Sequence, residues 1–143
     1  MLQITYDESA SGGSEITLQL NDAELTADAY FFALDRGCEP DSRSHAKVRA
    51  VLAVLLDQWH ERLASADDGA VVDLPFEFAD EFIGCLRCRI DGDDVDVAAG
   101  WLMTAGSAVV PSTATANLPA ADWEPRDDVP VVAVPRAELL KEI

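Results

Sequence analysis

The first twenty residues alternate between apolar and polar side chains, with a break in the middle. Apolar residues occupy every second position in residues 2–6 and again in residues 15–20. Side chains two positions apart lie on the same face of a strand, so each run predicts a β-strand. Residues 9–14, between the two runs, are rich in serine and glycine, which favour turns. The pattern predicts an antiparallel hairpin with a loose loop.

The spacing changes to that of a helix after residue 20. Asn21 and Asp22 can cap a helix, and Gly37 stands where it would end. The apolar residues that recur at helical spacing between them are Leu25, Ala29, Phe32 and Ala33. We therefore expect a helix between residues 21 and 37, although the aromatic pair at 30–31 also suits a strand.

A second helical pattern, over residues 44–66, is the clearest on the chain. Its apolar positions recur three and four residues apart, at Val48, Val51, Leu52, Leu55, Leu56, Trp59 and Leu63. Such a stripe is one face of an amphipathic helix, and Ser42 or Ser44 can supply its N-cap. The stripe also resembles a partner-binding face, but stripes of this kind usually pack on the domain's own core. We therefore predict a long core helix.

Strand patterns return between residues 71 and 101. Alternation predicts strands at 71–78, 82–90 and 95–101. Pro75 cannot donate a ladder hydrogen bond, so the first of these strands should be an edge strand or irregular. Residues 91–94 read Asp-Gly-Asp-Asp and predict a tight turn that joins the other two strands into a hairpin.

The last forty residues are less regular. Of the 22 residues 104–125, 15 are Ala, Gly, Ser, Thr or Pro. We expect an irregular surface wrap held by Leu118 and Trp123, with a short strand at 109–110 or a functional loop as alternatives. A strand at 129–134 and a short helix at 136–143 should follow.

Hairpins separated by helices favour the α+β class over alternating βαβ units. The sequence therefore predicts a single α+β domain over residues 1–143. Its core should be a largely antiparallel sheet of hairpins packed against one long amphipathic helix.

Charge narrows the range of functions. The chain has 143 residues, with 10 basic and 27 acidic side chains and a net charge of −17. Binding to nucleic acid or to an anionic membrane requires basic residues, so neither is expected. No apolar run is long enough for a transmembrane helix, and residues 1–8 lack the features of a signal peptide. Three cysteines, an odd number, argue against a disulfide framework, so we expect a cytoplasmic protein.

Candidate catalytic and metal motifs are weak. Cys85 and Cys88 have C-x-x-C spacing, but in a strand they would point to opposite faces, so buried thiols are expected. Residues 91–96 lack the glycine and glutamate of a calcium-binding loop. His45 and His60 lie about four helical turns apart, too far to share a metal. No nucleophile elbow or phosphate-binding glycine loop occurs, so we predict no catalytic residue, cofactor or metal and disfavour an enzyme.

The distribution of acidic residues is the strongest functional observation. Residues 65–96 contain ten acidic residues and two arginines, a net charge of −8. A surface of one sign attracts a partner of the opposite sign. We therefore expect a basic protein to bind the sheet and its turns. The candidate partner-binding residues are Asp73, Glu77, Asp91, Asp93, Asp94 and Asp96.

Three hypotheses about function remain open. The first is a non-enzymatic acidic interaction domain, since its physical profile matches neutralisers of basic nuclease toxins and proteins that mimic DNA charge, with no motif behind the match. The second is a domain whose acidity reflects a salt-adapted or GC-rich proteome. The third is a small-molecule binder or enzyme with a pocket between the long helix and the sheet, near Trp101, Cys88 and His60. Exposed hairpin edges also make a homodimer a possibility.

Overall fold

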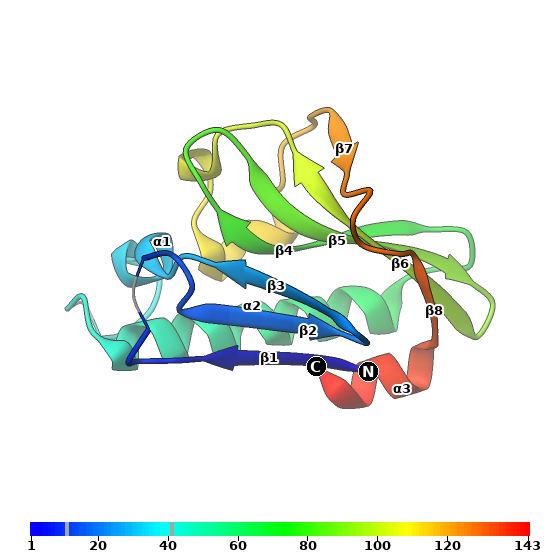
Figure 1. Ribbon diagram of the computed structural model, residues 1–143, viewed down its shortest axis with the longest axis horizontal. Helices are drawn as coiled ribbons and strands as arrows, with labels where there is room; N and C mark the ends of the chain where they lie inside the picture. The colour runs from blue at the N-terminus through cyan, green and yellow to red at the C-terminus, as the bar shows by residue number, and fades with distance from the viewer. Residues whose placement is uncertain (11, 41) are drawn as a thin grey trace.

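The computed structural model describes residues 1–10, 12–40 and 42–143, and it confirms the α+β class with mostly antiparallel sheets and few helices (Figure 1). The smaller sheet contains β1 (Leu2–Tyr6), β2 (Ile16–Leu20) and β3 (Ala23–Ala27). The larger sheet contains β4 (Val71–Phe78), β5 (Ile83–Asp91), β6 (Asp94–Leu102), β7 (Trp123–Pro125) and β8 (Val132–Pro135). The helices are α1 (Tyr30–Leu34), α2 (His45–Ser65) and α3 (Arg136–Glu142), with 3₁₀ helices η1 (Gly106–Ala108) and η2 (Pro111–Ala116).

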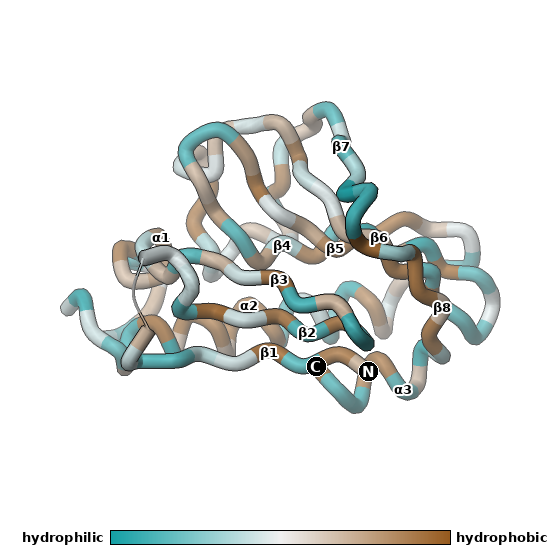
Figure 2. The backbone as a smooth tube through the Cα atoms, viewed as in Figure 1, coloured by the Kyte–Doolittle hydropathy of each residue, from teal (hydrophilic) through white to brown (hydrophobic). Residues whose placement is uncertain are grey.

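The N-terminal hairpin is confirmed, and a third strand joins it. β1 and β2 pair antiparallel, with Ile4 opposite Leu18. Apolar and polar positions alternate along β2 in the colours of Figure 2. The prediction of a helix between residues 21 and 37 is wrong at its start, because β3 pairs with β2. Asn21 adopts a left-handed φ of 51°, which asparagine tolerates, so the Asn-Asp pair makes a tight turn instead of a helix cap. Only α1 is helical in that stretch.

The helix predicted over residues 44–66 is present as the 21-residue α2. Ser44 caps it, since its side chain accepts a hydrogen bond of 3.2 Å from the Lys47 N–H. The predicted stripe belongs to the core except for Leu56, which is half-buried. Trp59 is fully buried and donates its indole N–H to the carbonyl of Pro75 in β4, at 3.1 Å. This bond ties α2 to the larger sheet.

The larger sheet confirms the hairpin predicted around residues 91–94. β5 and β6 pair from Ile83–Leu102 to Asp91–Asp94, so Gly92 and Asp93 form a two-residue turn. Gly92 has a φ of +61°, which suits the first position of such a turn and which glycine adopts without strain. β4 is an edge strand whose register shifts between Pro75 and Glu77, as the proline predicted.

The segment 104–125 contains more structure than expected. It forms η1, η2 and β7, and residues 109–110 lie between the two 3₁₀ helices instead of in a strand. Leu118 and Trp123 are half-buried against the core, but a stronger anchor lies in η2. There the buried Asp35 carboxylate accepts bonds of 2.7 Å and 3.0 Å from the backbone N–H and the hydroxyl of Ser112. η2 also packs against α2.

The chain ends close to where it begins. β8 starts at Val132, three residues later than predicted, and pairs with the first half of β6, while β7 pairs with its second half. The terminal helix α3 follows, and the Glu142 carboxylate accepts a bond of 2.7 Å from the backbone N–H of Leu2. The N and C labels are adjacent in Figure 1. This contact joins the C-terminal helix to the smaller sheet.

Candidate functional site

Two turns far apart in sequence meet at one end of the larger sheet. The Gly92 N–H donates to the Asp68 carboxylate at 2.8 Å, and the Gly69 N–H donates to the carbonyl of Ile90, also at 2.8 Å. The α2–β4 turn is thereby fixed beside the β5–β6 turn. The exposed side chains gathered here are Asp67, Asp68, Asp91, Asp93 and Asp94, and we call them the acidic tip.

A basic residue adjoins the acidic tip without occupying it. The half-buried Arg136, at the start of α3, donates its backbone N–H to the carbonyl of Asp93 at 2.7 Å. Its guanidinium turns to the carbonyl of Ala66, at 3.0 Å. None of the three ion pairs of the described residues includes a tip carboxylate. The acidic tip therefore carries its charge without a paired cation.

The predicted partner-binding residues Asp73 and Asp96 lie on another part of the surface. Both project from the larger sheet on the same side as the two arginines of β5, where Asp73 is opposite Arg87 and Asp96 is opposite Arg89. Arg87 donates to Asp73 through two bonds, of 2.8 Å and 3.0 Å, and these bonds raise the pKa of its guanidinium. This face is mixed in charge, so it differs from the acidic tip.

Glu77, the remaining candidate, lies beyond the bulge of β4. It is half-buried opposite Gly84, and burial raises the pKa of its carboxyl despite the opposing effect of Arg126. A raised pKa means that Glu77 holds its negative charge less readily than an exposed carboxylate. Of the six candidates, Asp91, Asp93 and Asp94 thus belong to the acidic tip, while Asp73, Glu77 and Asp96 lie outside it.

An open cavity of about 440 Å³ lies where β1 ends and α2 begins. Its walls come from three stretches of the chain: the end of β1 with the β1–β2 loop, the segment before α1 with α1 itself, and the start of α2 with the residues just before it. The polar residues that line it are Tyr6, Glu8, Glu15, Asp28, Tyr30, Arg43, Ser44 and His45. Its apolar residues are Ala10, Ala29, Ala33 and Val48.

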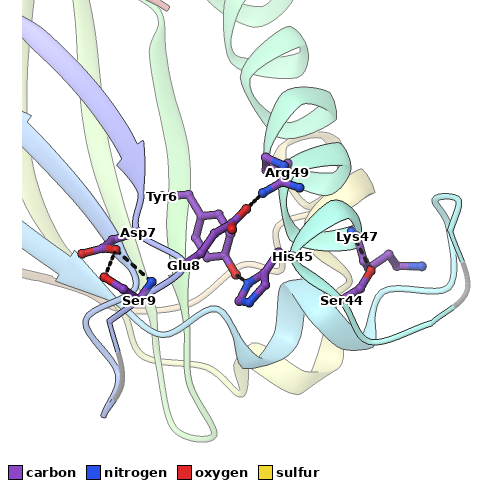
Figure 3. A network of polar contacts seen from close by, with 8 residues as sticks. All are labelled: Tyr6, Asp7, Glu8, Ser9, Ser44, His45, Lys47 and Arg49. Carbon is purple, nitrogen blue, oxygen red and sulfur yellow. Dashed lines mark hydrogen bonds and ion pairs between the residues drawn. The ribbon is translucent and has the colours of Figure 1, made fainter.

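A tyrosine and a histidine meet at the edge of this cavity. The Tyr6 hydroxyl lies 2.6 Å from Nδ1 of His45, and Figure 3 shows the two side chains pointing toward each other. Burial raises the pKa of Tyr6, with a smaller contribution from Glu15 that Arg49 opposes. His45 is the first residue of α2, so this contact ties the end of β1 to the start of the helix.

The carboxylates of the cavity differ in their partners. Glu8 forms an ion pair with Arg49 (Figure 3). Asp28 accepts the backbone N–H of Tyr30 at 2.8 Å. Glu15 has one buried carboxylate oxygen that finds no hydrogen-bond partner among the described residues. Neither Glu15 nor Asp28 forms an ion pair with another described residue. The wall therefore contains two carboxylates without an ion-pair partner among the described residues, the half-buried Glu15 and the exposed Asp28.

The residues expected to line a pocket do not do so. Cys88 is fully buried in the sheet, His60 is exposed in the second half of α2, and Trp101 packs edge-on against Phe82. The cavity contains His45 instead, and its other polar residues come from segments with no recognisable motif. Nothing in the sequence pairs Tyr6 with His45, because they are 39 positions apart and only the fold brings them together.

The cysteines are buried thiols, as expected. Cys85 and Cys88 are unexposed and Cys38 is half-buried, and all three are free. Burial raises the pKa of Cys88 to about 12 and that of Cys85 well above its usual value. A thiol with so high a pKa is a poor nucleophile and metal ligand at neutral pH.

Neither metal-binding clusters, membrane-spanning helices nor similarity to known proteins assigns a function to the part of the chain that the structure describes. Among the described residues, no group of three or more His, Cys, Asp and Glu side chains could hold a metal ion. No helix in that part of the chain is long and apolar enough to span a membrane. No protein-family model, curated protein or solved structure matches the chain.

Proposed function

We propose that this protein is a non-enzymatic interaction domain, located in the cytoplasm, whose acidic tip binds a basic protein. The observation that carries the proposal is the hydrogen-bonded junction of two turns, which brings five exposed aspartates together. Unpaired charges of one sign raise the association rate of an oppositely charged partner by roughly 10- to 1,000-fold. The proposal fits the profile of an inhibitor or immunity-type protein that covers a basic surface.

Proteome-wide acidity is the competing explanation. Exposed carboxylates also occur away from the tip, for example at Asp22, Glu24 and Glu81. These residues have no role in the proposed interaction, so they provide a matched control. The two explanations differ in whether the position of a charge matters or only the total charge.

The test compares two variants that each lose three negative charges. The tip variant is D91N/D93N/D94N, and the control is D22N/E24Q/E81Q. Each protein is immobilised and exposed to an extract of its own organism at about 50 mM and 300 mM salt, a range over which screening rises strongly. We expect the wild type and the control to retain the same basic protein at low salt, and the tip variant to retain at least tenfold less. Equal losses by both variants, or retention of no basic protein, would overturn the proposal.

A further inference from the structure

We propose that the cavity at the start of α2 binds a small organic cation, an ammonium or guanidinium group attached to a compact apolar body. Its volume of about 440 Å³ falls within the range of small-ligand sites, roughly 300–1,000 Å³. This site lies apart from the acidic tip, so it does not depend on the function proposed above.

The charge balance of the cavity favours a cation. Glu15 and Asp28 form no ion pair with described residues, and one oxygen of Glu15 is buried without a hydrogen-bond partner. Because that oxygen is inaccessible to solvent, a cation in the open cavity would interact with Glu15 through its charge and would bond directly to the exposed carboxylate of Asp28. The guanidinium of Arg49, next to the cavity, is already paired with Glu8. Arg43 is exposed at the rim and is the remaining basic residue in the wall.

An anion fits the cavity less well, although the first turn of a helix commonly binds anions. The backbone N–H of Lys47, in the first turn of α2, already donates to the Ser44 hydroxyl, so one N–H fewer is free to bind an anion. An anion would also lie near the unpaired carboxylates of Glu15 and Asp28. Both carboxylates would repel an anion that approached this helix end.

The remaining wall suits an apolar body next to the cation. Tyr6 and Tyr30 contribute aromatic rings, and Tyr30 as a residue is 53% exposed. An ammonium or guanidinium over such a ring is attracted by the negative face of its π system. Ala29, Ala33 and Val48 supply the apolar surface. Carboxylates beside aromatic rings form the chemistry that recognises an organic cation.

The test uses three probes of similar shape and different charge. These are 2-phenylethylamine, the neutral 2-phenylethanol and the anionic 3-phenylpropionate, each titrated into the whole protein by calorimetry and followed by NMR chemical shifts of the cavity residues. We expect the amine to bind at least tenfold more tightly than either analogue. Equal binding of the three probes, or no binding of the amine up to about 10 mM, which corresponds to roughly −2.7 kcal/mol, would overturn the inference.

Variants separate a specific site from general attraction to an acidic protein. Glu15→Gln and Asp28→Asn preserve side-chain shape and should each weaken amine binding by at least fivefold. The matched control D22N/E24Q and the tip variant D91N/D93N/D94N should bind the amine as the wild type does. A comparable loss in either control would contradict the assignment to this cavity. If both cavity variants unfold, Tyr30→Ala replaces them, and the chemical-shift change that the amine causes at Tyr6 should then be lost.

A last arm identifies the source of the cation. The tripeptide Gly-Arg-Gly presents a guanidinium as a protein segment would, whereas 2-phenylethylamine represents a free metabolite. Tighter binding of the tripeptide assigns the cavity to a basic side chain of a polypeptide, and tighter binding of the amine assigns it to a small molecule. Both results support a cation site.

Discussion

Cys85 and Cys88 lie on opposite faces of β5, yet neither thiol is exposed. Cys88 faces the same side as Leu86 and Ile90, whereas Cys85 lies on the side of Arg87. Burial raises the pKa of both thiols, so each strongly favours its protonated form in the folded chain. The first half of β5 is therefore buried on both faces, whereas its second half exposes Arg89 and Asp91.

These thiols should make the protein less stable in alkali. The ordinary pKa of a cysteine thiol is 9.0, and burial raises the pKa of Cys88 to about 12 in the folded chain. Between these values the folded chain binds more protons than the unfolded chain, so the free energy of unfolding falls as pH rises. Three pKa units correspond to about 4 kcal/mol. We expect C85A/C88A to show a shallower fall between pH 9 and 12 in urea unfolding experiments.

The slope, and not the absolute stability, is the readout for this prediction, because alanine also leaves small cavities in the core. Cys38→Ala is the matched control, since Cys38 is half-buried. It should retain the wild-type slope. A double variant whose stability falls as steeply as that of the wild type would show that other groups cause the alkaline loss.

At the scale of elements, a glycine in β6 allows the short strand β7 to pair beside it with the Trp123 ring packed closely against it. A Cβ at Gly100 would lie 2.5 Å from the Trp123 ring and 2.6 Å from the backbone carbonyl of Glu124. The same tryptophan ring stacks against the Arg87 guanidinium, 4.2 Å from the ring centroid, and Arg87 in turn binds Asp73. Gly100 thus supports a chain of contacts that fixes β7 and two polar residues of the sheet.

Gly100→Ala should displace β7 and destabilise the fold. Added atoms in a well-packed site cost roughly 1–3 kcal/mol, and the contact with backbone places this variant in the upper part of that range. We expect a lower urea midpoint and a changed tryptophan fluorescence. Ala98→Ser adds one atom on the same face of β6, at a half-buried position, and should change stability by less than about 0.5 kcal/mol. Equal effects from both variants would argue against a specific clash with Trp123.

Strands and turns could be predicted from the sequence where a few neighbouring residues determine them. Pro75 indicated an edge strand, and the Asp-Gly-Asp-Asp turn indicated a hairpin, because each acts within a few residues. The Asn21 turn was misassigned because asparagine serves both helix caps and left-handed turns. The course of residues 104–125 depends on Asp35, which lies 77 positions before its partner Ser112. A contact between residues so far apart cannot be predicted from the pattern of neighbouring residues.

The candidate sites divide in the same way. The acidic tip was partly predictable, since three of its aspartates follow one another around a single turn. The contribution of the α2–β4 turn was not, because it depends on the hydrogen bond between Gly92 and Asp68. Nothing in the sequence indicated the cavity at the start of α2, since its walls come from three separate stretches of the chain.

At the scale of the whole molecule, a net charge of −17 should oppose folding through self-repulsion. Two unit charges 4–8 Å apart in water repel each other by roughly 0.5–1 kcal/mol, and salt screens this repulsion over a Debye length of about 8–10 Å. The acidic tip places five exposed aspartates on two turns that a hydrogen bond joins. Repulsion should therefore be concentrated at the tip, although acidic residues also occur elsewhere.

This difference can be measured as a dependence of melting temperature on sodium chloride. The wild-type melting temperature should rise by several degrees between 20 mM and 500 mM salt, since about 1 kcal/mol corresponds to roughly 2–8 °C in domains of this size range. The tip variant D91N/D93N/D94N should melt higher than the wild type at 20 mM and respond less to salt. The control D22N/E24Q/E81Q removes the same charge from dispersed positions, so it should remain closer to the wild type. Identical behaviour of the two variants would show that the charge acts as a uniform coat, which favours proteome-wide acidity over a dedicated binding surface.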